Sequence, residues 1–123
     1  MREVIARHIR EPFEWGVSDC TFAFDAIEAM TGFDAIADCR GYLTERGAII
    51  ALKRTGFASV RDLVASCFEE IHPGLAIRGD IGYPEEINPL MSPAIIDGSQ
   101  VFSKQPRGPV ILERSAIARA WAV

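Results

Sequence analysis

Apolar residues in the first half of the chain recur at the three-to-four-residue spacing of amphipathic helices. This spacing predicts a short helix over residues 1–10, which Pro12 ends because its ring cannot continue a helix. A longer helix follows, with Ser18 or Asp19 as its N-cap and Gly32 closing it. Its apolar face is predicted to carry Cys20, Ala23, Phe24, Ile27 and Met30.

Two further helices are predicted before the pattern changes. The segment "LTERGAIIALKRT" has Thr44 as an N-cap and ends at Gly56, and "SVRDLVASCFEE" begins with a Ser59 cap. The pair Glu69-Glu70 is interpreted as solvated carboxylates at the end of this last helix, and Arg40 as a solvated loop arginine. The apolar face of the last helix is predicted to bury Val60, Leu63, Val64 and Cys67.

The second half of the chain has a different pattern, with short runs rich in Ile and Val that are broken by Gly and Pro. These runs predict strands, and Asp97-Gly98 between two of them predicts a β-hairpin. The tail "SAIARAWAV" fits either a helical turn or a last strand. Helices followed by antiparallel strands predict an α+β fold class. The length of 123 residues, without repeats or a linker, predicts one domain over residues 1–123.

Composition narrows the classes of function. Hydrophobic residues make up 49% of the chain, which argues against disorder and leaves more apolar surface than a small monomer easily hides. The net charge is −4 and the basic residues are scattered, so nucleic-acid binding is not expected. The segment "MREVIARHIR" lacks the apolar core of a signal peptide, and no window approaches a membrane helix. The sequence therefore predicts a product made in the cytoplasm that does not insert into membranes.

The cysteines and histidines are too few and too dispersed to predict a metal site. Cys20, Cys39 and Cys67 are an odd number with wide spacing, which is typical of reduced thiols. The chain has no CxxC motif, and His8 and His72 are its only histidines. A zinc site needs four ligands gathered together, so we expect no metal and no cofactor.

The stretch "PFEWGVSDCTFAF" carries the strongest chemical signal. Gly16 can adopt the positive φ of a tight corner after Trp15, and Cys20 then falls in the first turn of a helix. The helix dipole and unpaired backbone N–H groups stabilise a thiolate there and can bind an oxyanion, whereas the neighbouring Asp19 opposes the thiolate. The alternative is that Cys20 simply packs as a small apolar residue.

These residues also carry a family resemblance. The pattern F-x-W-G-x-x-D-C-T-F-A-F, followed by "GDI" and then "AIIDG", resembles the NlpC-type cell-wall peptidases. It is most similar to their short relatives encoded among phage tail-tip genes, and the resemblance runs from Pro12 to Val123. It implies a papain-like α+β fold in which a cysteine begins a central helix opposite a small antiparallel sheet. The sheet of such enzymes supplies a histidine and a third polar residue, and they cleave peptide bonds in peptidoglycan.

Several positions match the roles that the resemblance implies. Cys20 matches the family nucleophile, and Asp19 matches the residue that normally precedes it. Trp15 and Gly16 match the corner that leads into the helix, and Gly79-Asp80 matches the turn that leads into the first sheet strand. The resemblance therefore places the candidate site between the first corner and the sheet.

Other positions depart from the family pattern. Phe13 stands where the family usually has a tyrosine whose hydroxyl helps to hold the oxyanion, and Phe22 brings a bulky ring where a glycine is usual. Ser92 or its neighbours occupy the place of the family histidine. His72 precedes the strand-leading turn in an expected surface loop, and His8 is interpreted as a structural residue of the first helix. Serine cannot take and return protons near neutral pH as imidazole does.

Three functions stay open at this point. The first is a phage tail-tip or baseplate component, located at the virion tail tip, that binds tail hub proteins and has weakened or no catalytic power. The second is an active cysteine hydrolase that cleaves peptidoglycan peptides with Cys20 and an unidentified base, either from this chain or from a neighbouring subunit of the assembly. The third is a cell-encoded thiol protein of the same fold with a small acyl substrate.

Overall fold

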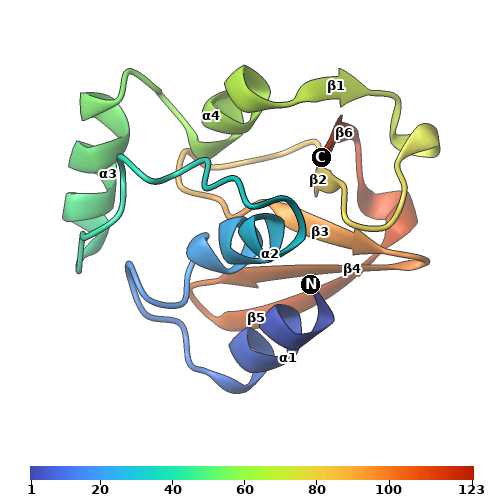
Figure 1. Cartoon of the computed structure of the whole chain (residues 1–123), viewed down its shortest axis with the longest axis horizontal. Coiled ribbons are helices and arrows are strands. Elements are labelled where there is room, and N and C mark those ends of the chain that lie inside the picture. Colours follow the sequence, from blue (N-terminus) through green and yellow to red (C-terminus); the bar gives the residue numbers. More distant parts are fainter.

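The computed structural model describes residues 1–123, and its helices precede its strands almost without mixing. This order confirms the predicted α+β class, and Figure 1 shows the arrangement. The helices are α1 (Arg2–Arg10), α2 (Thr21–Thr31), α3 (Glu45–Arg54) and α4 (Val60–Cys67), with short 3-10 helices at Pro73–Leu75 and Arg114–Ala116. The strands are β1 (Glu69–Ile71), β2 (Ile81–Tyr83), β3 (Ala94–Asp97), β4 (Gln100–Gln105), β5 (Gly108–Glu113) and β6 (Arg119–Ala122).

The six strands form one antiparallel sheet in the order β1-β6-β2-β3-β4-β5. The predicted hairpin joins β3 to β4, where Asp97 pairs with Gln100 and Gly98 adopts a φ of 68°. The tail of the chain contains both of the predicted alternatives, since a 3-10 turn at Arg114–Ala116 leads into strand β6. Strand β6 lies between β1 and β2, with Trp121 opposite both Glu70 and Ile81.

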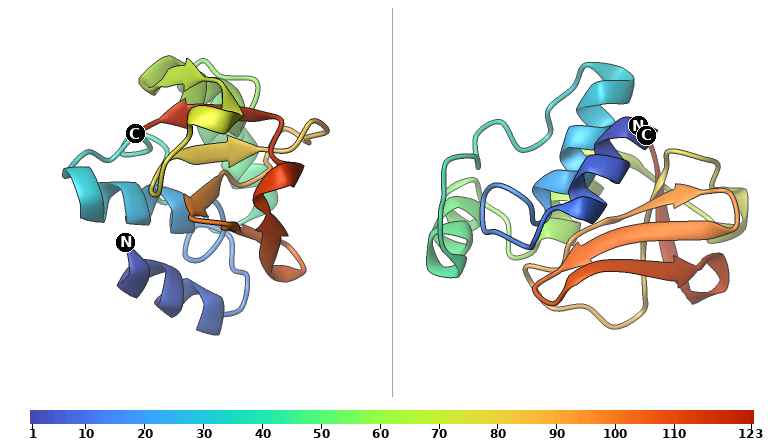
Figure 2. Two further views of the ribbon diagram at one scale, coloured as in Figure 1. Left: turned by 90° about the vertical axis from the view of Figure 1, so that its right-hand side faces the viewer. Right: turned by 90° about the horizontal axis from the view of Figure 1, so that it is seen from below.

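Helix α2 is the centre of the main core. It lies against one face of the sheet, and α1 packs beside it (Figures 1 and 2). Phe22 and Ala26 are buried as well as the predicted apolar face, whereas Met30 is exposed. The prediction of a single buried face is therefore wrong, because α2 is enclosed by α1, the sheet and the loops around it. The opposite face of the sheet has a smaller cluster formed by Ala76, Ala94, Ile96, Val101, Ile117 and Ala120.

Side-chain caps fix the starts of two helices as the sequence predicts. The hydroxyl of Thr44 accepts a hydrogen bond from the Gly47 N–H at 3.0 Å, and that of Ser59 accepts from the Asp62 N–H at 3.0 Å. Gly32 ends α2 in the left-handed conformation, with a φ of 77°. None of the helices is both long and apolar enough to cross a lipid bilayer.

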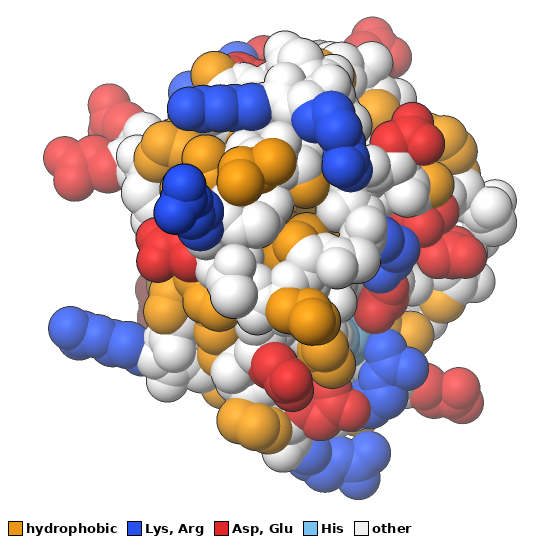
Figure 3. All heavy atoms as spheres, turned by 90° about the vertical axis from the view of Figure 1, so that its left-hand side faces the viewer, with side chains coloured by type: hydrophobic (Ala, Val, Ile, Leu, Met, Phe, Trp, Pro, Cys, Tyr) orange, Lys and Arg blue, Asp and Glu red, His pale blue; other side chains and the backbone are white.

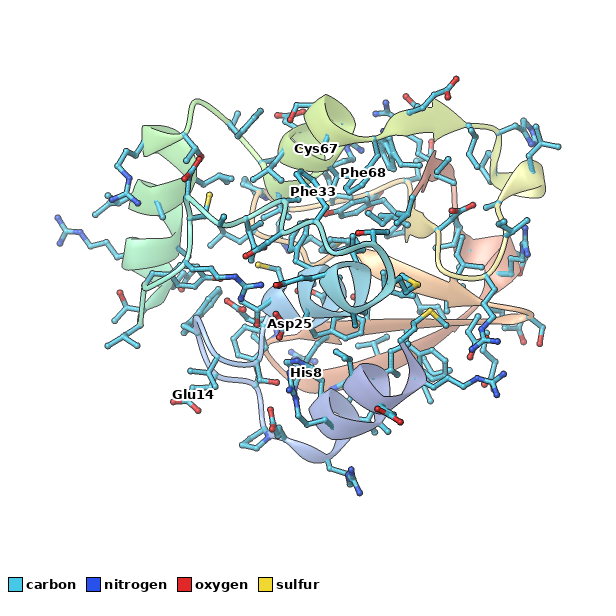
Figure 4. The ribbon with its side chains drawn as sticks, in the orientation of Figure 1. His8, Glu14, Asp25, Phe33, Cys67 and Phe68 are labelled. Carbon is cyan, nitrogen blue, oxygen red and sulfur yellow. The ribbon has the colours of Figure 1, made fainter.

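The end of α4 differs from the prediction in two ways. Cys67 is exposed instead of buried, and it lies beside Phe68, whose ring meets Phe33 edge to face at 6.2 Å (Figure 4). The helix ends before Glu69, because Phe68 is extended and the next three residues pair with β6 as an edge strand. Glu70 then receives two 2.7 Å hydrogen bonds from the Arg119 guanidinium, so this carboxylate belongs to a strand and not to a helix end.

Candidate functional site

Cys20 lies at the start of α2 as the sequence predicts, but it is the N-cap residue itself, a position for which the sequence predicts Ser18 or Asp19. The residue as a whole is half-buried. The first residues of the helix are held by its neighbour, because Asp19 Oδ1 accepts a hydrogen bond from the Thr21 N–H at 3.0 Å. Asp19 therefore satisfies an N–H at the helix start, but it lies one residue before the N-cap and is not the N-cap itself. Ser18, the other predicted cap, is turned away, and its hydroxyl contacts His8 instead.

The corner before the helix is held by a close backbone approach. Gly16 has a φ of 77°, and its N–H donates to Asp19 Oδ2 at 3.1 Å. A Cβ atom at this position would lie 1.9 Å from the carbonyl oxygen of Tyr42. The corner thus requires glycine for two reasons, the left-handed backbone and the contact with the loop that carries Tyr42.

Tyr42 completes a small group of residues that we call the thiol cluster, namely Gly16, Asp19, Cys20 and Tyr42. The Tyr42 hydroxyl donates to Asp19 Oδ2 at 2.6 Å and lies 3.4 Å from Cys20 Sγ. Tyr42 is not among the predicted site residues, and its only signal in the sequence is that it is one of two tyrosines in the chain. A tyrosine hydroxyl therefore does lie beside the thiol, although Phe13 lacks one.

Burial raises the pKa of the Cys20 thiol to about 12, and the Asp19 carboxylate adds to this rise. The hydrogen-bond contact between Cys20 and the Tyr42 hydroxyl lowers the pKa of the thiol but does not outweigh burial and the carboxylate. Burial raises the pKa of Tyr42, and its neighbours Cys20 and Asp19 add to this rise. The thiolate stabilisation expected at a helix start is thus overcome, and the thiol stays protonated near neutral pH.

Neither histidine reaches the sulfur, whose hydrogen-bond partner is the Tyr42 hydroxyl. His72 is exposed, and its Nδ1 accepts from the Gly74 N–H at 3.0 Å, which caps a 3-10 turn. His8 is buried on α1, with Nδ1 2.7 Å from Ser18 Oγ and Nε2 3.1 Å from Asp25 on α2 (Figure 4). The predicted structural role of His8 and the predicted surface position of His72 are confirmed.

His8 belongs to a second polar group, which we call the α1 network: His8, Ser18, Asp25, Arg40 and Lys104. Lys104 is buried, and its ammonium donates to Ser18 Oγ, to the His8 carbonyl and, at 2.7 Å, to the carbonyl of Glu11. This contact ties the C-terminal end of α1 to β4. Burial lowers the pKa of Lys104.

Arg40 closes the other side of the α1 network. It donates to Asp25 Oδ1 at 2.8 Å and to Asp34 Oδ2 at 2.8 Å, so it is an ion-paired residue and not the solvated arginine expected. Burial alone would raise the pKa of Asp25, but the hydrogen bonds from His8 and Arg40 hold it below its ordinary value. The α1 network is therefore satisfied internally.

A groove of about 450 Å³ lies next to the thiol cluster. One wall is α3, the other is formed by the 88–92 loop and the tip of the β4–β5 hairpin, and the 13–19 corner lies between them. Four of the predicted site residues line it: Phe13, Trp15, Asp19 and Ser92. The rings of Phe13 and Trp15 meet edge to face at 4.8 Å. The groove thus gathers residues that are distant in the sequence.

Cys20 does not line this groove. It lines a smaller apolar cavity of about 30 Å³, whose walls include Phe24, Ile36 and Cys39. Trp15 and Asp19 line both spaces, so the thiol lies one layer deeper than the groove.

Comparison with known protein families identifies the chain. The model of a family described as a domain of unknown function, DUF6950, matches residues 1–123. The chain belongs to the DUF6950 family. No curated protein and no solved structure matches it.

The thiol cluster and the groove of this DUF6950 domain offer different groups to another molecule. The thiol cluster holds a nucleophile-type residue, a carboxylate and a phenol, but no group that exchanges protons near neutral pH. No cluster of three or more His, Cys, Asp or Glu side chains is arranged to hold a metal ion. The groove of the DUF6950 domain is open to another molecule and lies beside the thiol cluster.

Proposed function

We propose that this DUF6950 domain is a degenerate NlpC-type, papain-like domain that serves as a structural component of a phage tail tip or baseplate and binds tail hub proteins. The "WG…DC…GD" order and a cysteine at the start of a central helix support the NlpC-type assignment. The observation that carries the loss of catalysis is the environment of Cys20, whose sulfur contacts a hydroxyl instead of an imidazole.

A physical argument connects this environment to a binding role. A cysteine hydrolase needs a base that removes the thiol proton and returns it to the leaving group. With a pKa of about 12, roughly one Cys20 thiol in 10⁵ is ionised at pH 7. A domain with so little thiolate and no base can still present the groove beside Trp15 to a partner.

Coexpression tests the binding role. The chain is produced with a tail hub protein encoded in the same gene cluster, and the mixture is separated by size-exclusion chromatography. We expect the two proteins to elute together, and we expect Cys20→Ala to elute in the same complex because the thiol lies below the groove. A wild-type chain that elutes alone as a monomer with every hub protein of the cluster contradicts the proposal.

Thiol alkylation tests the loss of catalysis. The rate of Cys20 modification is followed from pH 6 to pH 10 by mass spectrometry, with exposed Cys67 as an internal control for the reagent. We expect the Cys20 rate to keep rising through pH 10 without a plateau, because its pKa is about 12. A plateau near neutral pH, together with muropeptide cleavage that Cys20→Ala abolishes, supports the alternative of an active peptidoglycan hydrolase.

A further inference from the structure

The groove has an apolar centre. Ile49 and Leu52 of α3 face Leu90 of the opposite loop, and Trp15 lies between the two walls. Ile49 keeps 37% of its surface exposed, although it lines a hollow and not a convex surface. Figure 3 shows the side of the molecule that includes α3, where hydrophobic side chains lie between charged groups of both signs. Apolar side chains of a ligand would displace water from this part of the groove.

Two charges of opposite sign flank this centre. Glu45 and Lys53 line the same wall, and neither forms an ion pair within the chain. They are eight positions apart on α3, which corresponds to about 12 Å along a helix. An extended peptide covers this distance with about four residues, since each adds about 3.3 Å. The groove therefore suits a segment with a basic group at one end and an acidic group at the other.

Ser92 supplies a third feature. It lines the groove, it is only 4% exposed, and its hydroxyl makes no hydrogen bond within the chain. No buried side-chain polar atom of the chain lacks a partner, so this hydroxyl oxygen reaches solvent at the groove and can pair with a polar group from outside the chain. A backbone carbonyl or N–H group of an extended peptide offers such a partner.

We infer that the groove binds a short extended segment of the partner protein, about four residues long, with apolar side chains between a basic residue at Glu45 and an acidic residue at Lys53. This inference rests on the proposed function and specifies how the hub protein is held. A protein segment fits better than a substrate to be cleaved, because the protonated thiol of Cys20 lies below the groove wall.

Titration with a synthetic tetrapeptide tests the inference. The probe is acetyl-Lys-Leu-Leu-Glu-amide, added to the full chain and observed through the indole N–H signals of the two tryptophans by NMR. We expect the Trp15 signal to shift until it saturates, and the signal of Trp121, which is 1% exposed, to stay unchanged. Two control peptides carry lysine at both ends or glutamate at both ends of the same Leu-Leu centre. They should bind about two- to fivefold more weakly than the probe, as expected for the loss of one exposed ion pair.

Two neighbouring residues of α3 provide a matched pair of variants. Ile49→Asp places a charge inside the groove, whereas Ile50, which is 55% exposed, does not line it. We expect Ile49→Asp to lower the affinity for the probe about tenfold or more, and Ile50→Asp to leave this affinity unchanged. Glu45→Lys should reverse the preference, so that the peptide with two glutamates binds better than the Lys-Leu-Leu-Glu probe.

Several outcomes would overturn the inference. The first is a Trp15 signal that does not shift on titration. The second is a shift of the same size whether or not Ile49→Asp or the charges of the probe are changed. The third is a muropeptide that binds more tightly than any of the tetrapeptides. The hub complex separates this inference from the proposed function. If Ile49→Asp still elutes with the hub protein, the partner uses another surface, so the inference fails while the proposed function stands. If the wild type binds no hub protein, the proposed function fails, and the titration still decides what the groove binds.

Discussion

The thiol cluster and the α1 network meet at adjacent residues, Asp19 and Ser18, and each holds some of the groups that a hydrolase needs. The thiol cluster has the helix start and the neighbouring groove, but its sulfur has no imidazole. The α1 network has a serine, an imidazole and a carboxylate in hydrogen-bond contact, yet Ser18 and His8 are each 1% exposed and neither lines the groove. Activation of a nucleophile and access to it are thus separated, and chemistry needs both at one place.

The two regions also differ in how they stabilise the fold. In the α1 network a buried ammonium satisfies acceptors at the end of α1, so charge and hydrogen bonds hold a helix to the sheet. In the thiol cluster, the backbone of Gly16 lies close to the Tyr42 carbonyl, and the Asp19 carboxylate accepts hydrogen bonds from both residues. These contacts hold two loops together. Removing a group should therefore be most costly in the α1 network, where burial is more complete.

The largest effect is expected for Lys104→Met. The substitution keeps most of the apolar stem but leaves the His8 and Glu11 carbonyls and the Ser18 hydroxyl without their donor. We expect the free energy of unfolding to fall by about 4 kcal/mol, since each buried acceptor left unpaired costs roughly 1–3 kcal/mol. Urea unfolding followed by circular dichroism measures this change. Lys53→Met, at an exposed lysine, is the control and should differ from the wild type by less than about 0.5 kcal/mol.

Gly16→Ala should rank second. Gly32 has the same φ of 77° and nothing within 4 Å of an added Cβ, so Gly32→Ala isolates the backbone strain. We expect about 1 kcal/mol of destabilisation for Gly32→Ala, and about 2 to 3 kcal/mol for Gly16→Ala, where the methyl group also meets the Tyr42 carbonyl. Equal losses in urea unfolding would mean that the contact with Tyr42 is unimportant.

The raised pKa of Cys20 should make the stability of the fold depend on pH in the alkaline range. The ordinary thiol pKa is 9.0 and the folded value is about 12, so the folded state keeps a proton that the unfolded state releases above pH 9. Stability is therefore complete below about pH 9 and is lost as pH rises above it. Between pH 8 and pH 10 we expect the wild type to lose about 1 kcal/mol relative to Cys20→Ser. If the stability of the two proteins changes with pH in the same way, the pKa of the Cys20 thiol is not raised in the folded state.

The smallest effect is expected for Asp19→Asn. Removing the carboxylate charge removes one cause of the raised Cys20 pKa, so more thiolate forms at a given pH. We expect Cys20 alkylation at pH 8 to become about three- to tenfold faster, while Cys67 reacts at an unchanged rate. Glu45→Gln, which removes another carboxylate of the groove, is the control and should have no effect on Cys20. A Cys20 rate that stays constant or falls contradicts this reading of Asp19.

Local signals explain which parts of the fold are predictable from the sequence. Thr44, Ser59 and Gly32 act through neighbours three or four residues away, so their effects are visible in a short window. The Asp97-Gly98 hairpin is local for the same reason. Insertion of β6 between β1 and β2 depends on pairing between distant segments, and no short pattern encodes such a register.

The same distinction applies to the site. The position of Cys20 at a helix start follows from spacing within a few residues. The contact with Tyr42 comes from a loop that has no periodicity, and it depends on how that loop packs against Gly16. Lys104 lies in a strand whose alternation is compatible with an outward-pointing ammonium, so its burial against α1 is not predictable from the pattern.

The inserted position of β6 has a consequence for the order of folding. β1 is hydrogen-bonded to β6 and to no other strand, so residues 69–71 have no partner until residues 119–122 have been synthesised and have docked. Closure of the sheet is thus a long-range event, which is typically slower than formation of local helices and hairpins. During synthesis, β1 should therefore be the last strand to gain protection from hydrogen exchange, well after β3 and β4 have joined.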